Sequence, residues 1–151
     1  MSVEREKKWD YRFLELADHV SQWSKDPSTK VGAVVVDPYN RILGMGYNGL
    51  PMHVKDEDIR YNDRNLKYKM IVHAEANAIL HSNFDLTGSS LYCTHMCCSN
   101  CTGLIIQSGI STVVCYAPDK QFYDRYKESI NISEVMMKEA SIGLWLYEKN
   151  K

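Results

Sequence analysis

The sequence predicts an α/β protein, a three-layer α/β/α sandwich around a mixed sheet of about five strands. Segments with helical periodicity alternate with short β-branched runs along most of the chain. A hairpin in the first third provides antiparallel strands, and a strand–helix–strand unit further on provides parallel ones. The chain has 151 residues, 44% of them hydrophobic and 25% charged, so we expect a single domain over residues 1–151 with one buried core.

The first elements are an amphipathic helix and a β-hairpin. Residues 7–24 carry apolar side chains at helical spacing, and Asp26-Pro27 ends the helix because proline disfavours helical backbone at the residue before it. The β-branched run 31–36 and the extended run 41–47 are separated by the turn residues Asp37-Pro38-Tyr39-Asn40. This arrangement predicts two antiparallel strands.

A charged, tyrosine-rich segment follows the hairpin. Residues 53–72 show little periodicity, so we expect a long functional loop with room for one short helix. The loop contains His53, Arg60, Arg64 and Tyr68. We expect it either to close over a bound nucleotide or to line a contact between copies of the chain.

The second half of the chain alternates helices and strands. Good helix formers, glycines at helix ends and β-branched runs indicate the elements. In order they are helix 73–82, strand 91–94, helix 98–108, strand 112–116, a short segment 122–127, helix 132–140 and strand 143–147. Two strands joined by one helix should be parallel, which brings the loops at their C-terminal ends together.

Charge and cysteine content exclude several classes of protein. The formal net charge of −1 gives no overall attraction to polyanions, so we expect no nucleic-acid partner, although one local pocket can still hold a small anion. Five cysteines, an odd number, and the lack of a basic-then-apolar segment after Met1 favour a reducing, cytoplasmic location. The apolar runs are far shorter than the ~20 residues of a membrane helix, so we expect no membrane partner.

Two short motifs lie at the predicted helix starts. His73-Ala74-Glu75 opens one helix, and Cys98-Ser99-Asn100-Cys101 opens the next. Cys98 and Cys101 lie on one face of a helix start, where the positive end of the helix dipole favours thiolate over thiol. Glu75 lies about 200° around the helix from His73, but in a first turn both side chains can reach one cavity. The motifs therefore predict two helix N-termini that converge on one metal ion.

This residue set suits a catalytic zinc ion. His73, Cys98 and Cys101 as ligands leave the fourth tetrahedral position to water, whose pKa zinc lowers from 15.7 to roughly 7. Glu75, if it is not a ligand, can take the water's proton and pass it to a ring nitrogen and to a departing amine. Such proton transfer suits attack on an amidine-like carbon such as C4 of cytosine.

Alternative interpretations of the motifs stay open. A single Cys-x-x-Cys also occurs in thiol redox sites, and His-x-Glu occurs by chance. A structural zinc would prefer four protein ligands, and His95, Cys93 and Cys97 are candidates for the fourth. The two motifs together favour catalysis, with a non-catalytic, zinc-stabilised binding module as the alternative.

With these residues placed, the chain resembles the zinc-dependent cytidine and deoxycytidylate deaminase superfamily over roughly residues 9–120, and most closely its deoxycytidylate (dCMP) branch. The resemblance rests on SKDPSTKVGA at 24–33, GYNGLP at 46–51, HAEANAI at 73–79, CSNC at 98–101 and LIIQSGI at 104–110. The first two segments point to the dCMP branch, and the zinc motifs identify the superfamily.

The resemblance implies a cytidine-deaminase-like fold and hydrolytic deamination of dCMP to dUMP and ammonia, in pyrimidine nucleotide metabolism. It implies that His73, Cys98 and Cys101 bind Zn²⁺ and that Glu75 moves the proton. It also implies a homo-oligomer, and regulation by dCTP together with Mg²⁺. The alternative within enzymes is a deaminase of free (deoxy)cytidine or of an RNA base.

The resemblance also suggests contacts to the nucleotide. Asn48 matches a substrate-contacting asparagine, although a turn residue in Asn-Gly is nearly as compatible with the sequence. Tyr116, at the end of a strand, is expected to pack against the base or sugar, with a core aromatic as the alternative. The residues expected near the 5′-phosphate are Ser24, Lys25, Ser28, Lys30 and Lys120. Each of these lysines has a solvated surface charge as its alternative role.

One position departs from the family pattern. The family commonly has proline immediately before the first cysteine ligand, whereas this chain has Met96-Cys97 there. Proline would fix the backbone at the helix entrance, so its loss leaves this turn less constrained and makes Cys97 a rival ligand or an oxidation partner of Cys98. The x-x spacing still favours Cys98. Acceptance of 5-substituted dCMP depends on pocket depth, which the sequence does not give.

Overall fold

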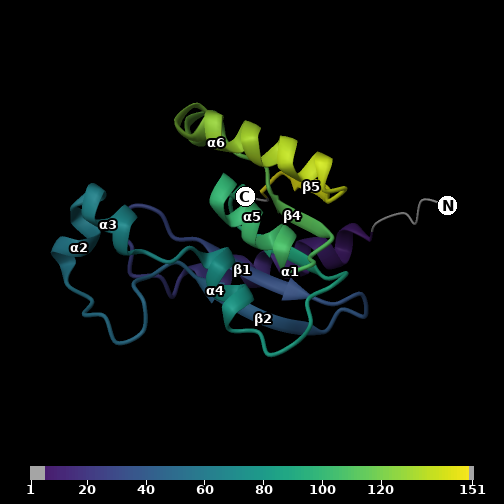
Figure 1. Cartoon of the computed structure of the whole chain (residues 1–151), viewed down its shortest axis with the longest axis horizontal. Coiled ribbons are helices and arrows are strands. Elements are labelled where there is room, and N and C mark those ends of the chain that lie inside the picture. Colours follow the sequence, from purple (N-terminus) through teal and green to yellow (C-terminus); the bar gives the residue numbers. More distant parts are fainter. Residues whose placement is uncertain (1–5, 150–151) are drawn as a thin grey trace.

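The computed structural model describes residues 6–149, whose five strands form one mixed sheet in the order β2-β1-β3-β4-β5 (Figure 1). The strands are β1 (Gly32–Val36), β2 (Ile42–Tyr47), β3 (Ser90–Cys93), β4 (Thr112–Tyr116) and β5 (Gly143–Tyr147). The helices are α1 (Lys7–Ser21), α2 (Asp58–Asn62), α3 (Arg64–Met70), α4 (Ala74–Leu80), α5 (Ser99–Gln107) and α6 (Lys120–Glu139). The domain predicted over residues 1–151 extends beyond the described residues at both ends.

The strand directions agree with the sequence prediction. β1 pairs antiparallel with β2 and β3, while β3–β4 and β4–β5 are parallel pairs. The predicted hairpin and the predicted parallel pair are both confirmed. The C-terminal ends of β3 and β4 therefore lie at the same edge of the sheet, and the chain continues from them into α5 and α6.

Helices cover both faces of the sheet, which confirms the three-layer sandwich. Alternate strand residues point to opposite faces. On one face, α1 packs against Val34, Val36, Tyr92, Val114 and Tyr116. On the other face, α4, α5 and α6 share a core with Ala33, Val35, Leu91, Cys93, Val113 and Cys115.

Two glycines let helices lie directly on strands. A Cβ atom at Gly32 would lie 1.9 Å from the carbonyl oxygen of Ala17 in α1. A Cβ atom at Gly46 would lie 2.4 Å from the backbone nitrogen of Ala78 and 2.6 Å from the carbonyl oxygen of Ala74. Any larger residue at Gly46 would push α4, and with it the His73–Glu75 motif, away from the sheet.

Two predictions about helices were wrong. Residues 53–72 hold two short helices, because the Asp63 side chain accepts a hydrogen bond from the Leu66 amide and caps α3 directly after α2. Segments 122–127 and 132–140 join into the single helix α6, which is kinked at Tyr126 (φ −114°, ψ 17°). Among residues 6–149, no helix combines the length and hydrophobicity needed to cross a lipid bilayer.

Candidate active site

The start of α4 places His73 and Glu75. Backbone hydrogen bonds in both directions between Gly49 and Val72 fix the chain just before the helix. His73 is the N-cap residue with extended backbone (φ −73°, ψ 155°), and Ala74 is fully buried against the sheet. Glu75 is only 5% exposed and lines a pocket. The helix start therefore directs an imidazole and a carboxylate toward the same pocket.

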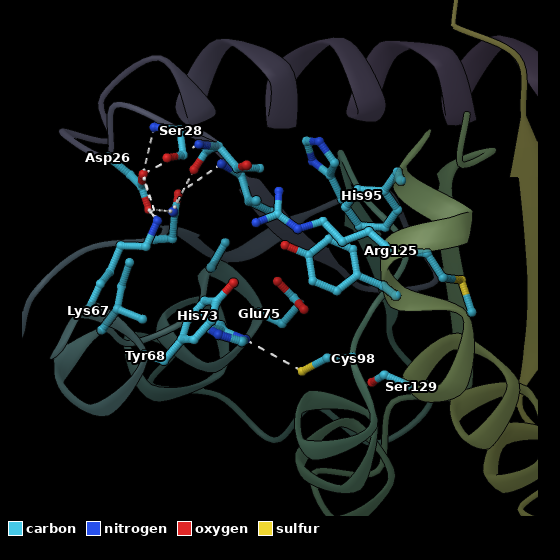
Figure 2. Close-up of a pocket in the computed structure, with 18 of the residues that line it drawn as sticks. Asp26, Ser28, Lys67, Tyr68, His73, Glu75, His95, Cys98, Arg125 and Ser129 are labelled. Carbon is cyan, nitrogen blue, oxygen red and sulfur yellow. Dashed lines mark hydrogen bonds and ion pairs between the residues drawn. The ribbon is translucent and has the colours of Figure 1, made fainter. Parts of the chain in front are cut away.

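The start of α5 brings the two thiols to His73. Cys98 is the N-cap residue, and its Sγ accepts a hydrogen bond from the Cys101 amide at 3.4 Å. His73 Nδ1 lies 3.5 Å from Cys98 Sγ (Figure 2). It lies 3.3 Å from Cys101 Sγ. Zn–S bonds of about 2.3 Å and Zn–N bonds of about 2.0 Å at tetrahedral angles place N and S ligand atoms about 3.5 Å apart. The three predicted ligands thus form a group with the chemistry and spacing that suit zinc.

The charges in this group favour metal binding. The pKa of Cys98 is lowered to about 4, first by its hydrogen bond with Cys101 and then by His73, so Cys98 is a thiolate at neutral pH. The pKa of Cys101 is raised, mainly because its thiol proton bonds to that thiolate. The pKa of Glu75 is raised by burial, an effect that His73 partly opposes. A carboxyl with a raised pKa is suited to accept and return a proton near neutral pH.

The rival ligands lie apart from this group. Cys93 and Cys97 are fully buried, and their sulfur atoms group with the Glu75 carboxylate instead. His95 Nδ1 lies 3.0 Å from the Thr94 hydroxyl. Within residues 6–149, no fourth His, Cys, Asp or Glu joins the three ligand atoms. The group therefore has the three protein ligands typical of catalytic zinc.

A pocket lies beside the three ligands. Its empty volume is about 880 Å³, including open solvent at its mouth. Its walls come from the loop before β1, from α3, from the starts of α4 and α5, and from the first half of α6.

One wall is held by a buried polar network. The Lys67 ammonium of α3 lies 3.2 Å from Asp26 Oδ2, and the side chains of the pair are 8% and 3% exposed. Asp26 also accepts hydrogen bonds from the amides of Ser28 and Thr29 and from the Asn48 side chain. This network ties the loop before β1 to α3 (Figure 2).

The Asn48 side chain belongs to the same network. Its Oδ1 accepts from the Val31 amide at 2.8 Å, and its Nδ2 donates to the Thr29 carbonyl at 2.9 Å. Asn48 lines the pocket, but most of its hydrogen-bonding capacity holds the loop. One Oδ1 lone pair remains for a ligand.

The structure brings few of the other predicted substrate residues to the pocket. Ser28 lines it, as do Arg64 and Tyr68 of the segment predicted to close over the nucleotide. Ser24, Lys25, Lys30, Tyr116 and Lys120 do not line it. Tyr116 points to the α1 face of the sheet, and Ser24 is buried with its hydroxyl on the Asn48 carbonyl. Lys25 and Lys120 pair with Asp56 and Asp124 at the surface.

Sequence reasoning missed several pocket residues. The first half of α6 contributes Phe122, Arg125, Tyr126 and Ser129. The kink at Tyr126 lies between Arg125 and Ser129, so helical spacing in the sequence gave no signal for this set. Lys67 and Asp26 gave no signal, because a buried ion pair between distant segments has no sequence pattern.

Comparison with known proteins agrees with the geometry. A family model described as the zinc-binding region of cytidine and deoxycytidylate deaminases matches residues 7–117. The chain belongs to this family. The predicted class of protein, a zinc-dependent hydrolytic deaminase, is confirmed by this match, and the roles of the individual residues in the two motifs stay predictions.

Individual relatives cover different shares of the chain. An uncharacterized deaminase in the luxG 3′ region of Aliivibrio fischeri is 44% identical over 140 residues, 92% of this chain and 94% of that protein. Human deoxycytidylate deaminase is 39% identical over 112 residues, 70% of this chain and 63% of that protein. The crystal structure of the dCMP deaminase of cyanophage S-TIM5 with dCMP and dUMP matches with a TM-score of 0.75 and 26% identity, over 95% of this chain and 100% of that one.

Proposed function

We propose that this chain converts dCMP to dUMP and releases ammonia. One observation carries the proposal: the His73–Cys98–Cys101 group and Glu75 lie at a pocket that Arg64 and Arg125 also line. Neither arginine forms an ion pair with an acidic residue among residues 6–149. A deaminating centre beside two cations suits a cytosine nucleotide better than a nucleoside. The relatives named deoxycytidylate deaminase support the same substrate.

Metal binding and proton transfer are assigned to different residues of the site. His73, Cys98 and Cys101 would hold the zinc ion, which supplies a hydroxide at neutral pH. Glu75 accepts the proton of the attacking water on a carboxylate oxygen and delivers it to N3 of the cytosine ring. Glu75 then takes the proton of the hydroxyl group now on C4 and passes it to the amine, so that a C4 carbonyl forms as the C4–N bond breaks and ammonia leaves. The low exposure of Glu75 keeps bulk water from taking this proton.

For the 5′-phosphate we propose Arg64 and Arg125, which extend from opposite walls, α3 and α6. In this proposal the two arginines replace Lys25, Lys30 and Lys120 as the residues assigned to the phosphate. Guanidinium groups match phosphate oxygens in two-bond geometry, which a lysine cannot offer. Asn48 is proposed to use its remaining lone pair for a sugar hydroxyl.

Steady-state kinetics with dCMP, deoxycytidine, a cytosine-containing oligonucleotide and 5-methyl-dCMP test the proposal. We expect the highest kcat/KM for a monophosphate. R125A and R64A should each raise KM for dCMP by about 10–100-fold, the loss of a charge-assisted hydrogen bond of about 1.5–3 kcal/mol, with little effect on deoxycytidine. R41A is the matched control, since Arg41 pairs with Asp37 at the surface. Faster turnover of deoxycytidine or of the oligonucleotide would contradict the proposal.

Family membership also motivates three finer proposals: a homo-oligomer, regulation by dCTP with Mg²⁺, and a cytoplasmic location. Sedimentation of the purified chain tests the first. Rates measured with and without dCTP and Mg²⁺ test the second, where an unchanged rate at every dCMP concentration would contradict regulation. Fractionation of the source cells tests the third.

A further inference from the structure

The peptide groups on both sides of Cys98 are held by serines of α6. The Ser133 hydroxyl donates a hydrogen bond to the Cys97 carbonyl at 3.0 Å. The Ser129 hydroxyl accepts one from the Ser99 amide at 2.9 Å. Ser133 is fully buried, and Ser129 lies half-buried beside Cys98 (Figure 2). Two hydrogen bonds from α6, a helix distant in sequence, thus hold the turn that carries Cys98, a proposed zinc ligand.

Both hydrogen bonds satisfy backbone groups that α5 leaves without a partner inside the helix. Ser99 is the first residue of α5, so its amide has no acceptor within the helix. The Cys97 carbonyl precedes the helix, and both Cys97 and its partner Ser133 are fully buried. Residue 97 is a cysteine, so no proline ring fixes the backbone at this position. The constraint on the turn therefore comes from α6.

We propose that Ser129 and Ser133 are positioning residues for the metal, which direct Cys98 Sγ toward His73 and Cys101. They are four residues apart and lie on one face of α6, so both act on the same turn at once. With the peptides before and after it fixed, Cys98 keeps its N-cap backbone (φ −72°, ψ 166°). This inference rests on the zinc site of the proposed function. It adds a support from residues beyond the segment 7–117 that the family model matches.

The test compares serine-to-alanine variants at the two ends of α5. S129A, S133A and the double variant remove the hydrogen bonds to the ligand turn. S108A is the matched control, because the Ser108 hydroxyl donates to the Ile105 carbonyl at 2.7 Å at the opposite end of the same helix. The readouts are zinc affinity by competition with a chelator and the visible absorption of Co²⁺ bound in place of zinc, which reports coordination geometry.

We expect the double variant to bind zinc about 10–100-fold more weakly than the natural chain, as is typical when residues that orient metal ligands are lost. Its Co²⁺ spectrum should change, S108A should match the natural chain, and S129T should retain most of the affinity because the hydroxyl stays. Natural zinc affinity and an unchanged Co²⁺ spectrum in a folded double variant would overturn the proposal. If the double variant does not fold, the zinc affinity and the Co²⁺ spectrum of S129A provide the test, since Ser129 is only half-buried and its loss should be tolerated.

These readouts require no substrate. A natural chain that binds zinc with high affinity but leaves dCMP unchanged would overturn the proposed function and leave the role of the serines intact. Weaker zinc binding in the serine variants supports that role whichever nucleotide is deaminated.

Discussion

The two walls of the pocket are built in different ways. The metal wall, made by the starts of α4 and α5, is packed into the core: Ala74 is fully buried, Cys101 is 3% exposed, and Gly46 leaves no space between α4 and β2. The substrate wall, made by the loop before β1 and by α3, has no such packing. Among residues 6–149, the backbones of α2 and α3 lie close to each other and not to the other helices or strands, and they project from the sheet in Figure 1.

Polar contacts hold the substrate wall in place. The buried Lys67–Asp26 pair and the backbone pairing of Gly49 with Val72 join α3 to the rest of the fold. Apolar packing spreads its stabilisation over many atoms, whereas a buried ion pair concentrates it in two groups. Metal geometry should therefore survive most single substitutions, while the position of the substrate wall should be sensitive to loss of the Lys67–Asp26 pair.

Removal of zinc should have the largest effect on turnover and little effect on the packed wall. We expect dialysis against a chelator to abolish deamination of dCMP, because the attacking hydroxide is lost, and added zinc to restore it. Far-UV circular dichroism should stay unchanged, since Ala74 and Ile105 are buried independently of the metal. Full activity in protein shown by elemental analysis to be free of metal would contradict the catalytic role.

E75Q should lower kcat for dCMP by about 10²–10⁴-fold, the usual contribution of a positioned general acid/base. Zinc content and the unfolding midpoint should stay near those of the natural chain, because the amide keeps the shape of the carboxyl. E134Q on the exposed surface of α6 serves as the control. Near-natural turnover in E75Q would remove Glu75 from the mechanism.

K67M should displace the substrate wall, which is the loop before β1 and α3, without moving the zinc ligands of the metal wall. This substitution leaves the buried Asp26 carboxylate without its cationic partner, which lowers the free energy of unfolding by about 3–5 kcal/mol. We expect KM for dCMP to rise more than kcat falls, with zinc affinity unchanged. Urea unfolding and kinetics measure these effects.

Two further variants sharpen this result. K25M, which breaks the exposed pair with Asp56, should leave stability and kinetics nearly unchanged. K67M/D26N should recover part of the lost stability because no charge is left buried. Equal effects of K67M and K25M would show that burial of the Lys67–Asp26 pair has no consequence.

Zinc affinity should fall as pH falls, by about tenfold per pH unit, which is the smallest of the expected effects. The sign follows from the thiols: Cys98 is already a thiolate, but the raised pKa of Cys101 means that its proton must leave when zinc binds. Protons therefore compete with zinc. The raised pKa of His73, due first to its hydrogen bond with Cys98, adds a second competing proton below that pKa, so the slope should steepen toward the acid end of the range. Chelator competition between pH 6 and 8 measures the slope, and a flat profile would contradict this proton count.

The sequence predicted that His73, Cys98 and Cys101 lie together, as the structure has them, but not α3 or most of the residues that line the rest of the pocket. His73 and Cys101 could be placed together because motif spacing and helix starts are local features. Strands such as 112–116 were found because both faces of the sheet are covered and the residues are β-branched. α3 was missed because its pocket-facing residues, such as Arg64 and Lys67, are polar and leave no apolar stripe.

The substrate residues show the same limit. Tyr116 follows Cys115 on a strand, so the two must face opposite sides of the sheet, and Cys115 lies on the face of α4, α5 and α6. Strict use of this alternation would have removed Tyr116 from the prediction. Lys30 and Lys120 were chosen for closeness along the chain, which does not determine the direction of a side chain.

The kink of α6 at Tyr126 has a consequence for protein engineering. Before it, Phe122 and Arg125 line the pocket; after it, Ser133 and Met137 are buried against the rest of the fold. Residues 120–125 are therefore a natural place for a combinatorial library aimed at altered nucleotide selectivity. Residues 129–137 should be kept constant in such a library, so that each variant inherits an intact metal centre.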